Sequence, residues 1–314
     1  MRCVLITGAG GFVGRALCAE TVLRGVAVRG IVRTRGELPK GVEQIVMGDI
    51  GGDVNWAAAA NGCDAVVHLA GRAHVMQELE TDPLTEYRRV NVLGTLNLAR
   101  QAAQNGVRRF VFVSSIGVNG AMTACQPFTA EDQVSPHSPY AQSKYEAELE
   151  LRRFASVAGM QLVITRPPLV YGPEAPGNFG SLIRLLRRGL PLPLGAIHNR
   201  RSLVALDNLV DLIMTCLTHP TAANQIFLVS DGEDVSTSEL LRRMGRAMGR
   251  PARLIPVPAS WLKLAAAMIG KADVAQRLCG SLQVDIEKTR RLLGWSPPLS
   301  LDEGLRRAAG MHNP

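Results

Sequence analysis

The residues best equipped for chemistry in this sequence are Tyr140 and Lys144, in the run Tyr-Ala-Gln-Ser-Lys. On a helix, positions i and i+4 share a face, so the phenol and the ammonium group would point into the same space. A lysine cation beside a tyrosine lowers the pKa of the phenol from its usual value of about 10, which makes it a usable acid or base. Ser114 and Ser115 would place hydroxyl groups at the carboxyl end of a strand that begins near Phe110. This pattern predicts a proton-transfer site.

A glycine-rich turn, Thr7–Gly14 (TGAGGFVG), directly follows the first apolar run and opens a segment of helical spacing. Gly8 permits a tight turn, Gly11 lets backbone N–H groups approach a diphosphate, and Gly14 lets helix and strand pack closely. The glycines are more tightly spaced than in the G-x-G-x-x-G pattern. Their place at the first strand-to-helix turn predicts a dinucleotide-binding site.

The end of the second apolar run carries arginines rather than a carboxylate. Dinucleotide-binding folds place an acidic residue about 20 residues past the glycines, where it binds the ribose 2′-OH of NAD. Here that position is Arg33, followed by Arg35, and no carboxylate occurs until Glu37. A guanidinium pairs with the 2′-phosphate of NADP, which a carboxylate would repel. The alternative is that Arg33 stacks on the adenine or faces solvent. The pattern favours NADP (NADPH) as cofactor, and NAD stays possible.

The elements that must position these residues alternate in type. Apolar runs predict strands at 3–6, 27–32, 44–46, 65–69, 110–113, 162–165 and 225–229, and helical spacing occurs at 14–24, 87–105, 140–158, 238–248 and 302–309. This alternation predicts an α/β fold, a Rossmann doubly wound parallel sheet covered on both faces. Prolines crowd the chain after Arg166. We therefore expect a dinucleotide-binding domain over 1–170 and a second, smaller C-terminal substrate-binding lobe over 171–314, with about 203–230 returning to the main sheet.

Composition excludes several classes of protein. Hydrophobic residues make up 46% and charged residues 20% of the 314 residues, as in a globular protein. With 4% aromatic residues, few side chains could stack on bases, so no nucleic-acid partner is expected. The net charge of +8 suits an anionic small ligand. The six cysteines lack metal-ligand spacing, so no metal site is expected. No apolar stretch approaches the length of a spanning helix, which predicts a cytoplasmic protein. The apolar helix at 260–269 is expected to pack in the core or the lobe, with contact to a membrane surface as the alternative.

The sequence resembles the extended branch of the short-chain dehydrogenase/reductases, the NAD-dependent epimerase/dehydratase group. Its members include nucleotide-sugar 4-epimerases, dehydratases and 4-ketoreductases of surface polysaccharide (O-antigen) biosynthesis. The resemblance covers essentially the whole chain. The matching motifs are the glycine turn at 7–14, GDI at 48–50, HLAG at 68–71, NVLGT at 91–95, SS at 114–115, YAQSK at 140–144 and RPPLVYGP at 166–173.

The resemblance implies a role for each matching residue. Ser115, Tyr140 and Lys144 would be catalytic, with Tyr140 as the general acid/base and Lys144 also holding the nicotinamide ribose. Asn91 matches a helix-bending asparagine, whereas Asn119 departs from the family, which usually has tyrosine before the glycine. The residues expected to contact the cofactor are Gly8, Gly11, Phe12, Val13, Gly14, Arg33, Arg35, Asp49, Ile50, Leu69, Ala70, Gly71, Asn91, Tyr140, Lys144 and Pro167.

Substrate contacts are expected from Ser115 and from the second lobe. The segment NRRSLV at 199–204 resembles the family's RDYIHV segment, which places Arg201 on the diphosphate of a UDP-sugar. A guanidinium suits that group because it forms paired, charge-assisted hydrogen bonds. Asn178 is expected to contact the sugar or the diphosphate. Leu282 falls near a position that is a large aromatic residue in some hexose epimerases, and the smaller side chain leaves room for an N-acetyl group.

The favoured function is an NAD(P)H-dependent nucleotide-sugar oxidoreductase that reduces a UDP-4-keto-6-deoxy-N-acetylhexosamine, because NADP suits net reduction. One alternative is a UDP-N-acetylglucosamine/UDP-glucose 4-epimerase that retains NAD. Another is a non-catalytic dinucleotide-sensing protein, although such proteins tend to lose the tyrosine or the lysine. A 4,6-dehydratase is disfavoured because Ser115 is followed by Ile116 and Gly117 rather than by an acidic pair. The resemblance also implies a homodimer formed through the helices near 87–105 and 140–158.

Overall fold

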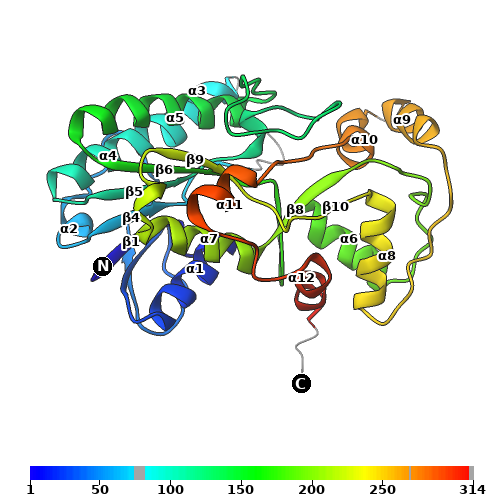
Figure 1. Ribbon diagram of the computed structural model, residues 1–314, viewed down its shortest axis with the longest axis horizontal. Helices are drawn as coiled ribbons and strands as arrows, with labels where there is room; N and C mark the ends of the chain where they lie inside the picture. The colour runs from blue at the N-terminus through cyan, green and yellow to red at the C-terminus, as the bar shows by residue number, and fades with distance from the viewer. Residues whose placement is uncertain (74–81, 269, 311–314) are drawn as a thin grey trace.

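The structure is a computed structural model that describes residues 1–73, 82–268 and 270–310, without the side chains of residues 178 and 273 (Figure 1). It has a larger unit, built on a seven-stranded sheet, and a smaller unit, built on a three-stranded sheet.

The seven-stranded sheet is parallel throughout, with the strand order β3-β2-β1-β4-β5-β6-β9. Its strands are β1 (Cys3–Thr7), β2 (Ala27–Val32), β3 (Val42–Val46), β4 (Ala65–His68), β5 (Arg109–Val113), β6 (Gln161–Arg166) and β9 (Gln225–Leu228). The order reverses between β1 and β4, and a doubly wound sheet opens its ligand crevice at the carboxyl ends of the strands at that point.

Helices cover both faces of this sheet. One face carries α1 (Phe12–Leu23), α7 (Leu206–Thr218) and α11 (Glu287–Leu293), and the other carries α2 (Ala57–Ala60), α4 (Thr95–Gln104) and α5 (Pro139–Ala158). Alternate strand residues pack against opposite layers: Val4 and Ile6 belong to the core under α1 and α7, and Leu5 to the core under α4 and α5. Because both faces are buried, the strands read as continuous apolar runs.

Three shorter segments connect these layers. A short helix α3 (Pro83–Arg88) leads through the π-helix η1 (Arg89–Gly94) into α4. The 3₁₀-helix η2 (Ile116–Val118) follows β5, and η3 (Pro220–Ala222) precedes β9. The π-helix widens one turn of the helix that runs from α3 to α4, a distortion often found at functional sites.

The smaller unit is built on strands β7 (Leu169–Tyr171), β8 (Arg201–Ala205) and β10 (Asp234–Val235), in the order β10-β8-β7. Its helices are α6 (Gly177–Arg187), α8 (Thr237–Ala247), α9 (Ala259–Met268), α10 (Ala272–Cys279) and α12 (Leu301–Ala308). The last helix closes its core. The hydroxyl of Tyr171 lies within hydrogen-bond distance of the Leu301 carbonyl and of Asp231, at 3.2 and 2.7 Å. A Cβ at Gly304 would lie 2.4 Å from the same hydroxyl, so only glycine fits there.

The fold class predicted from the sequence is confirmed, and the strand expected at 225–229 is the edge strand β9 of the main sheet. Within the segment 203–230, α7 and β9 belong to the larger unit, and β8 belongs to the three-stranded sheet. The apolar helix expected at 260–269 is α9, which packs on the lobe only in part: Leu262 is half-buried against the core of the smaller unit, whereas none of the described residues of α9 is fully buried. In the described part of the chain, no helix is long and apolar enough to cross a membrane.

Candidate active site

The glycine turn lies where β1 passes into α1, at the carboxyl edge of the sheet. Gly8 has a φ of 68°, which favours glycine, and its carbonyl accepts a hydrogen bond of 2.9 Å from the Gly11 N–H. A Cβ at Gly14 would lie 2.0 Å from the Gly8 carbonyl oxygen, so the helix and the turn touch there without a side chain between them. The glycine spacing thus follows from the close contact of turn and helix.

The first turn of α1 fits the diphosphate of a dinucleotide. Among the described residues no side chain caps this helix, and its first turn holds no acidic residue. The N–H groups of Phe12, Val13 and Gly14 are therefore available to an anion, which the helix dipole also favours. The backbone of Leu69 and Ala70 lies beside the turn, because a Cβ at Gly8 would come within 3.0–3.2 Å of it.

A buried network, which the sequence analysis missed, fixes this edge of the sheet. Nδ1 of His68 lies 2.7 Å from the Thr7 hydroxyl, which accepts a hydrogen bond from the Ala70 N–H at 3.1 Å. Nε2 lies 2.8 Å from the Thr95 hydroxyl, which itself donates to the Asn91 carbonyl at 2.7 Å. Since Thr95 uses its proton on Asn91, His68 donates from Nε2 and accepts at Nδ1. Burial, with a further contribution from Lys144, lowers the pKa of His68 to about 3, so this imidazole is neutral and structural.

Asn91, in the π-helix η1, ties the loop after β4 to α5. Its Oδ1 accepts from the Arg72 N–H at 2.8 Å, and its Nδ2 donates to the Arg72 carbonyl at 3.1 Å and to Oγ of Ser143 at 2.9 Å. Ser143 in turn donates to the Tyr140 carbonyl at 2.8 Å. A Cβ at Gly71 would lie 2.9 Å from Oδ1 of Asn91, which explains the glycine. Asn91 therefore positions the loop 71–72 against the helix that carries Tyr140.

The three expected catalytic residues come from the end of β5 and from α5. Ser138 caps α5 and so sets the position of Tyr140 in its first turn. The Tyr140 ring lies edge-on to Tyr87, with 6.2 Å between ring centroids. Nζ of Lys144 lies over the Phe112 ring at 4.1 Å from its centroid. A Cβ at Gly117 would lie 3.4 Å from both Ser115 Oγ and Ala141 Cβ, so Ser115 flanks the first turn of α5.

The acidities of this pair differ from the expectation. Burial raises the pKa of Tyr140 to about 12, and Tyr87 adds to this effect. Burial lowers the pKa of Lys144 to about 7, and Glu148 opposes this effect. The expected lowering of the phenol pKa by Lys144 is therefore wrong for the chain by itself, because removal from water disfavours both charged forms.

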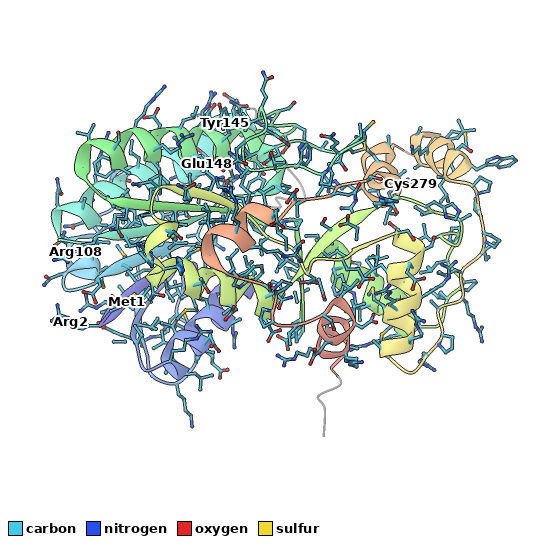
Figure 2. The ribbon with its side chains drawn as sticks, viewed as in Figure 1. Met1, Arg2, Arg108, Tyr145, Glu148 and Cys279 are labelled. Atoms are coloured by element: carbon cyan, nitrogen blue, oxygen red, sulfur yellow. The ribbon has the colours of Figure 1, made fainter. Side chains whose placement is uncertain are left out.

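A buried ion pair supports Lys144 from the next turn of α5, and the sequence analysis missed this pair as well. Nη2 and Nε of Arg166 lie 2.5 and 3.0 Å from the two carboxylate oxygens of Glu148, which Figure 2 marks on α5. Nη1 of Arg166 donates to Oδ1 of Asn119 at 2.9 Å, and Nδ2 of Asn119 donates to the Thr129 carbonyl at 2.8 Å. Asn119 is thus buried in this network rather than facing a substrate. The spacing of Glu148 four residues after Lys144 was the available signal.

The residues expected around the adenosine lie along the edge formed by β2 and β3. Arg33 and Arg35 are exposed just past the end of β2. Ile50 is buried, and the exposed Asp49 lies 3.4 Å from Nη2 of Arg89.

Pro167, another residue expected to contact the cofactor, is buried after β6, and its carbonyl accepts from the Ile116 N–H at 3.0 Å.

Arg201 and Leu282, the expected substrate residues of the smaller unit, lie next to each other and pair through an isolated β-bridge. Nη1 of Arg201 donates to the carbonyls of Arg277 and Gly280, at 2.5 and 3.3 Å. Burial lowers the pKa of Arg201 from its usual value. The side chain of Asn178 lies outside the described residues.

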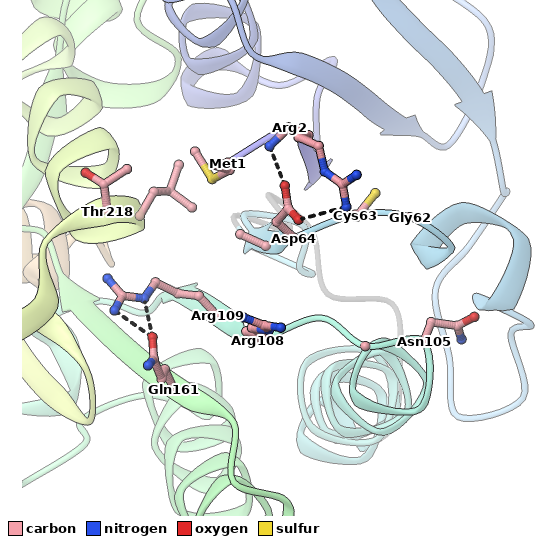
Figure 3. Close-up of a pocket in the computed structure, with 13 residues that line it drawn as sticks. Met1, Arg2, Gly62, Cys63, Asp64, Asn105, Arg108, Arg109, Gln161 and Thr218 are labelled. Atoms are coloured by element: carbon pink, nitrogen blue, oxygen red, sulfur yellow. Dashed lines mark hydrogen bonds and ion pairs between the residues drawn. The ribbon is translucent and has the colours of Figure 1, made fainter.

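A cavity lies at the opposite edge of the sheet, beside the amino ends of β1, β4, β5 and β6 (Figure 3). Its volume is about 710 Å³. Arg2 there pairs with Asp64. Arg109 donates to Oε1 of Gln161 and to the carbonyls of Cys216 and His219. Since doubly wound sheets bind ligands at the carboxyl ends of their strands, this cavity is not the candidate site. The described residues also hold no cluster of metal ligands.

The sheet topology and the glycine turn at its crevice define a dinucleotide-binding α/β enzyme. The chain belongs to the NAD dependent epimerase/dehydratase family, whose model matches residues 4–230. It is 46% identical to a UDP-glucose 4-epimerase of Vibrio cholerae over 98% of this chain and 94% of that protein. It is 27% identical, over 97% and 93% of the two chains, to an N-acetyl-alpha-D-glucosaminyl-diphospho-ditrans,octacis-undecaprenol 4-epimerase of Escherichia coli O157:H7. The solved structure of MoeE5 in complex with UDP-glucuronic acid and NAD aligns with a TM-score of 0.78 at 26% identity, over 98% of each chain. The resemblance noted from the motifs is thereby confirmed.

Proposed function

We propose that this protein is a UDP-sugar 4-epimerase that retains NAD and acts on UDP-glucose or UDP-N-acetylglucosamine. The observation that carries the proposal is the 46% identity to a UDP-glucose 4-epimerase over nearly the whole of both chains. The names of the relatives support this alternative better than the 4-ketoreductase that the sequence analysis favoured.

Each end of the cofactor has residues suited to hold it. The uncapped first turn of α1 would bind the diphosphate, Asp49 and Ile50 would flank the adenine, and Lys144 would bind the nicotinamide ribose. Bound NAD supplies an acceptor for a hydride from the sugar C4, and the same hydride can return to either face of the ketone. Because the hydride would return to the sugar, the retained cofactor would end as NAD. Net isomerisation would therefore need no added reductant.

In this proposal, Tyr140 removes the proton of the 4-hydroxyl group and later returns it, while Ser115 donates a hydrogen bond to the same oxygen. The phenol pKa of about 12 must fall for this step. The group in this chain that can lower the phenol pKa is the ammonium of Lys144 on the same helix face, since a nearby positive charge favours the phenolate. Glu148 raises the pKa of Lys144 and so favours the charged form.

The substrate diphosphate would bind at Arg201. Among the described residues, the hydrogen-bond partners of this guanidinium are backbone carbonyls. Carbonyl partners orient the guanidinium without neutralising it, so its charge is available to an anion. Leu282 lies beside it, and its modest size leaves room for an N-acetyl group. Asn178 would add a polar contact to the sugar or the diphosphate.

A second candidate function is NADPH-dependent reduction of a UDP-4-keto-6-deoxy-N-acetylhexosamine. The observation in its favour is the pair Arg33 and Arg35, which is exposed at the end of β2 and forms no ion pair among the described residues. Two such cations suit the 2′-phosphate of NADP.

One experiment separates the two candidates. The purified protein is denatured, and the released nucleotide is identified by mass spectrometry. The native protein is incubated with UDP-N-acetylglucosamine or UDP-glucose without added cofactor, and with a UDP-4-keto-6-deoxyhexosamine plus NADPH or NADH. Released NAD together with interconversion of the 4-epimers supports the epimerase. Stoichiometric oxidation of NADPH without epimerisation assigns the reductase, and dinucleotide binding without turnover leaves the sensing protein.

A further inference from the structure

Helix α9 presents an apolar face that nothing in the described chain covers. Trp261, Leu264 and Met268 are 71%, 65% and 75% exposed. Their spacing of three and four residues places them on one side of the helix, which we call the α9 face. The helix lies at the outer end of the smaller unit, beside α10 (Figure 1). A compact lobe would normally bury such side chains, and exposed apolar patches mark interaction sites.

The chain segment that contains α9 is rich in basic residues, of which Arg250 lies just after α8 and donates to the Arg187 carbonyl. The segment 250–279 holds a single aspartate, Asp273, and five exposed basic residues, which are Arg250, Arg253, Lys263, Lys271 and Arg277. Among the described residues none of these five forms an ion pair. Half of the chain's net charge of +8 is therefore concentrated in this segment.

We propose that α9 docks on the surface of an anionic phospholipid bilayer. A helix with an apolar face, a basic residue on its opposite face and further basic residues in the same chain segment fits the headgroup region, where apolar burial and attraction to anionic lipids act together. Its ten residues extend about 15 Å, half the thickness of the hydrocarbon core, so the helix lies in the interface and does not span it. A second copy of this chain fits the same face less well, because the two cationic segments would repel each other.

The docking helix is connected to the candidate substrate site through α10. The carbonyls at the end of α10 orient two polar side chains of the smaller unit: Arg277 and Gly280 accept from Arg201, and Leu278 and Gly280 accept from Nδ2 of Asn199. Figure 2 marks Cys279 at this end of α10. A bilayer contact at α9 would therefore bring the segment that holds Arg201 close to the membrane surface.

Trp261 is an intrinsic fluorescent probe for this docking. Trp56 and Trp295 are buried, whereas Trp261 is exposed. Full-length protein is mixed with vesicles of phosphatidylcholine alone or of phosphatidylcholine with phosphatidylglycerol, and flotation and tryptophan emission are recorded. We expect flotation with the anionic vesicles, a blue shift of the emission and protection from a soluble quencher. Raising the salt concentration should weaken the binding, because screening reduces the attraction between exposed charges.

Two double variants test the face directly. Leu264→Ala/Met268→Ala keeps Trp261 and should weaken vesicle partitioning about tenfold or more. The matched control, Leu23→Ala/Val46→Ala, removes exposed apolar side chains from the larger unit and should bind as the wild type does. Lys263→Glu/Lys271→Glu should abolish the preference for anionic vesicles.

Three results would overturn the proposal. They are failure of the wild type to float with anionic vesicles, undiminished binding by Leu264→Ala/Met268→Ala, and a change from dimer to monomer in that variant, which would assign the face to a second copy. Vesicle binding is measured without turnover, so these outcomes are independent of the UDP-sugar activity.

Discussion

Lys144 is a buried cation that lies over the ring of Phe112 and four residues before Glu148 on the same helix. With a pKa near 7 it changes charge close to neutral pH. A charged Lys144 favours the phenolate form of Tyr140, whereas a neutral one leaves the phenol a poor acid. The protonation of these two residues is therefore coupled, and the pH dependence of turnover belongs to the pair.

Replacing Tyr140 by Phe should lower turnover about 10²–10⁴-fold, because the ring remains and only the proton-transferring hydroxyl is lost. Cofactor binding should persist, as measured by the nucleotide released on denaturation. Tyr145→Phe is the matched control, on the same helix and marked in Figure 2, and should keep its activity. Full activity of Tyr140→Phe would show that another group moves the proton.

Replacing Lys144 by Met should stabilise the nucleotide-free protein at low pH. The folded pKa is about 7, and the unfolded value is about 10.4, so between these values the unfolded chain binds a proton that the folded chain lacks. Burying the Lys144 ammonium therefore lowers the unfolding free energy by its full amount below pH 7. This loss disappears as the pH rises to the lysine pKa of the unfolded chain.

Relative to the wild type, the Met variant should therefore lose about 3 kcal/mol of its advantage in unfolding free energy between about pH 6.5 and 9.5. Denaturant unfolding at both pH values measures this change. Burial is the main cause that lowers the pKa of His68, and it keeps this imidazole neutral in both folded proteins over this pH range, although the variant loses the smaller contribution of Lys144. An advantage that does not change with pH would contradict the assigned pKa.

The sequence predicted Gly8, Gly14, Tyr140 and Lys144 because their spacing along one turn or one helix face is itself the geometric requirement. It did not predict the contacts of Arg166, which reach Glu148 on α5 and Asn119 beyond η2. Such contacts depend on how β6 packs beside α5, and local spacing carries no information about that packing.

At the scale of elements, the π-helix η1 connects the loop after β4 with helix α5 through the hydrogen bonds of Asn91. Asn91→Ala would remove a buried amide that hydrogen-bonds the N–H and the carbonyl of Arg72 and Oγ of Ser143. We expect a loss of about 3 kcal/mol in unfolding free energy. Asn105→Ala is the control, since among the described residues its Nδ2 donates to a single acceptor, the Gln101 carbonyl at the end of α4. Equal losses in the two variants, measured by denaturant unfolding, would remove the role assigned to η1.

The central strands of the main sheet were predictable because burial on both faces makes them mainly apolar, whereas the edge strand β3 has no fully buried residue and was predicted only over 44–46. The placement of β8 was not, since its apolar run suits either sheet and only pairing with β7 and β10 decides it. The exposure of α9 was hidden for a related reason, because an apolar helix has the same composition whether a lobe or another surface covers it. A domain boundary near residue 170 stays our proposal.

For the whole molecule we predict a homodimer formed through η1, α4 and α5. Leu93, on η1, is exposed on this side of the larger unit. Light scattering should give about twice 33.8 kDa. Leu93→Asp should shift the protein toward monomer, and Leu23→Asp on α1 should not. A wild-type monomer at working concentration would refute this assembly.

Because helix α12 completes the core of the smaller unit, the two units are completed at different times during synthesis. The Leu301 carbonyl accepts a hydrogen bond from the Tyr171 hydroxyl, and Gly304, which has no side chain, lies against the same hydroxyl. Arg307 forms an ion pair with Asp207 at 2.7 Å. A ribosome makes these residues after every strand of both sheets. The larger unit has all its strands once Leu228 is synthesised, whereas the core beside β7 stays open to water until α12 is synthesised. A nascent chain that stalls before Leu301 would therefore expose that core, and chaperones and proteases recognise such surfaces.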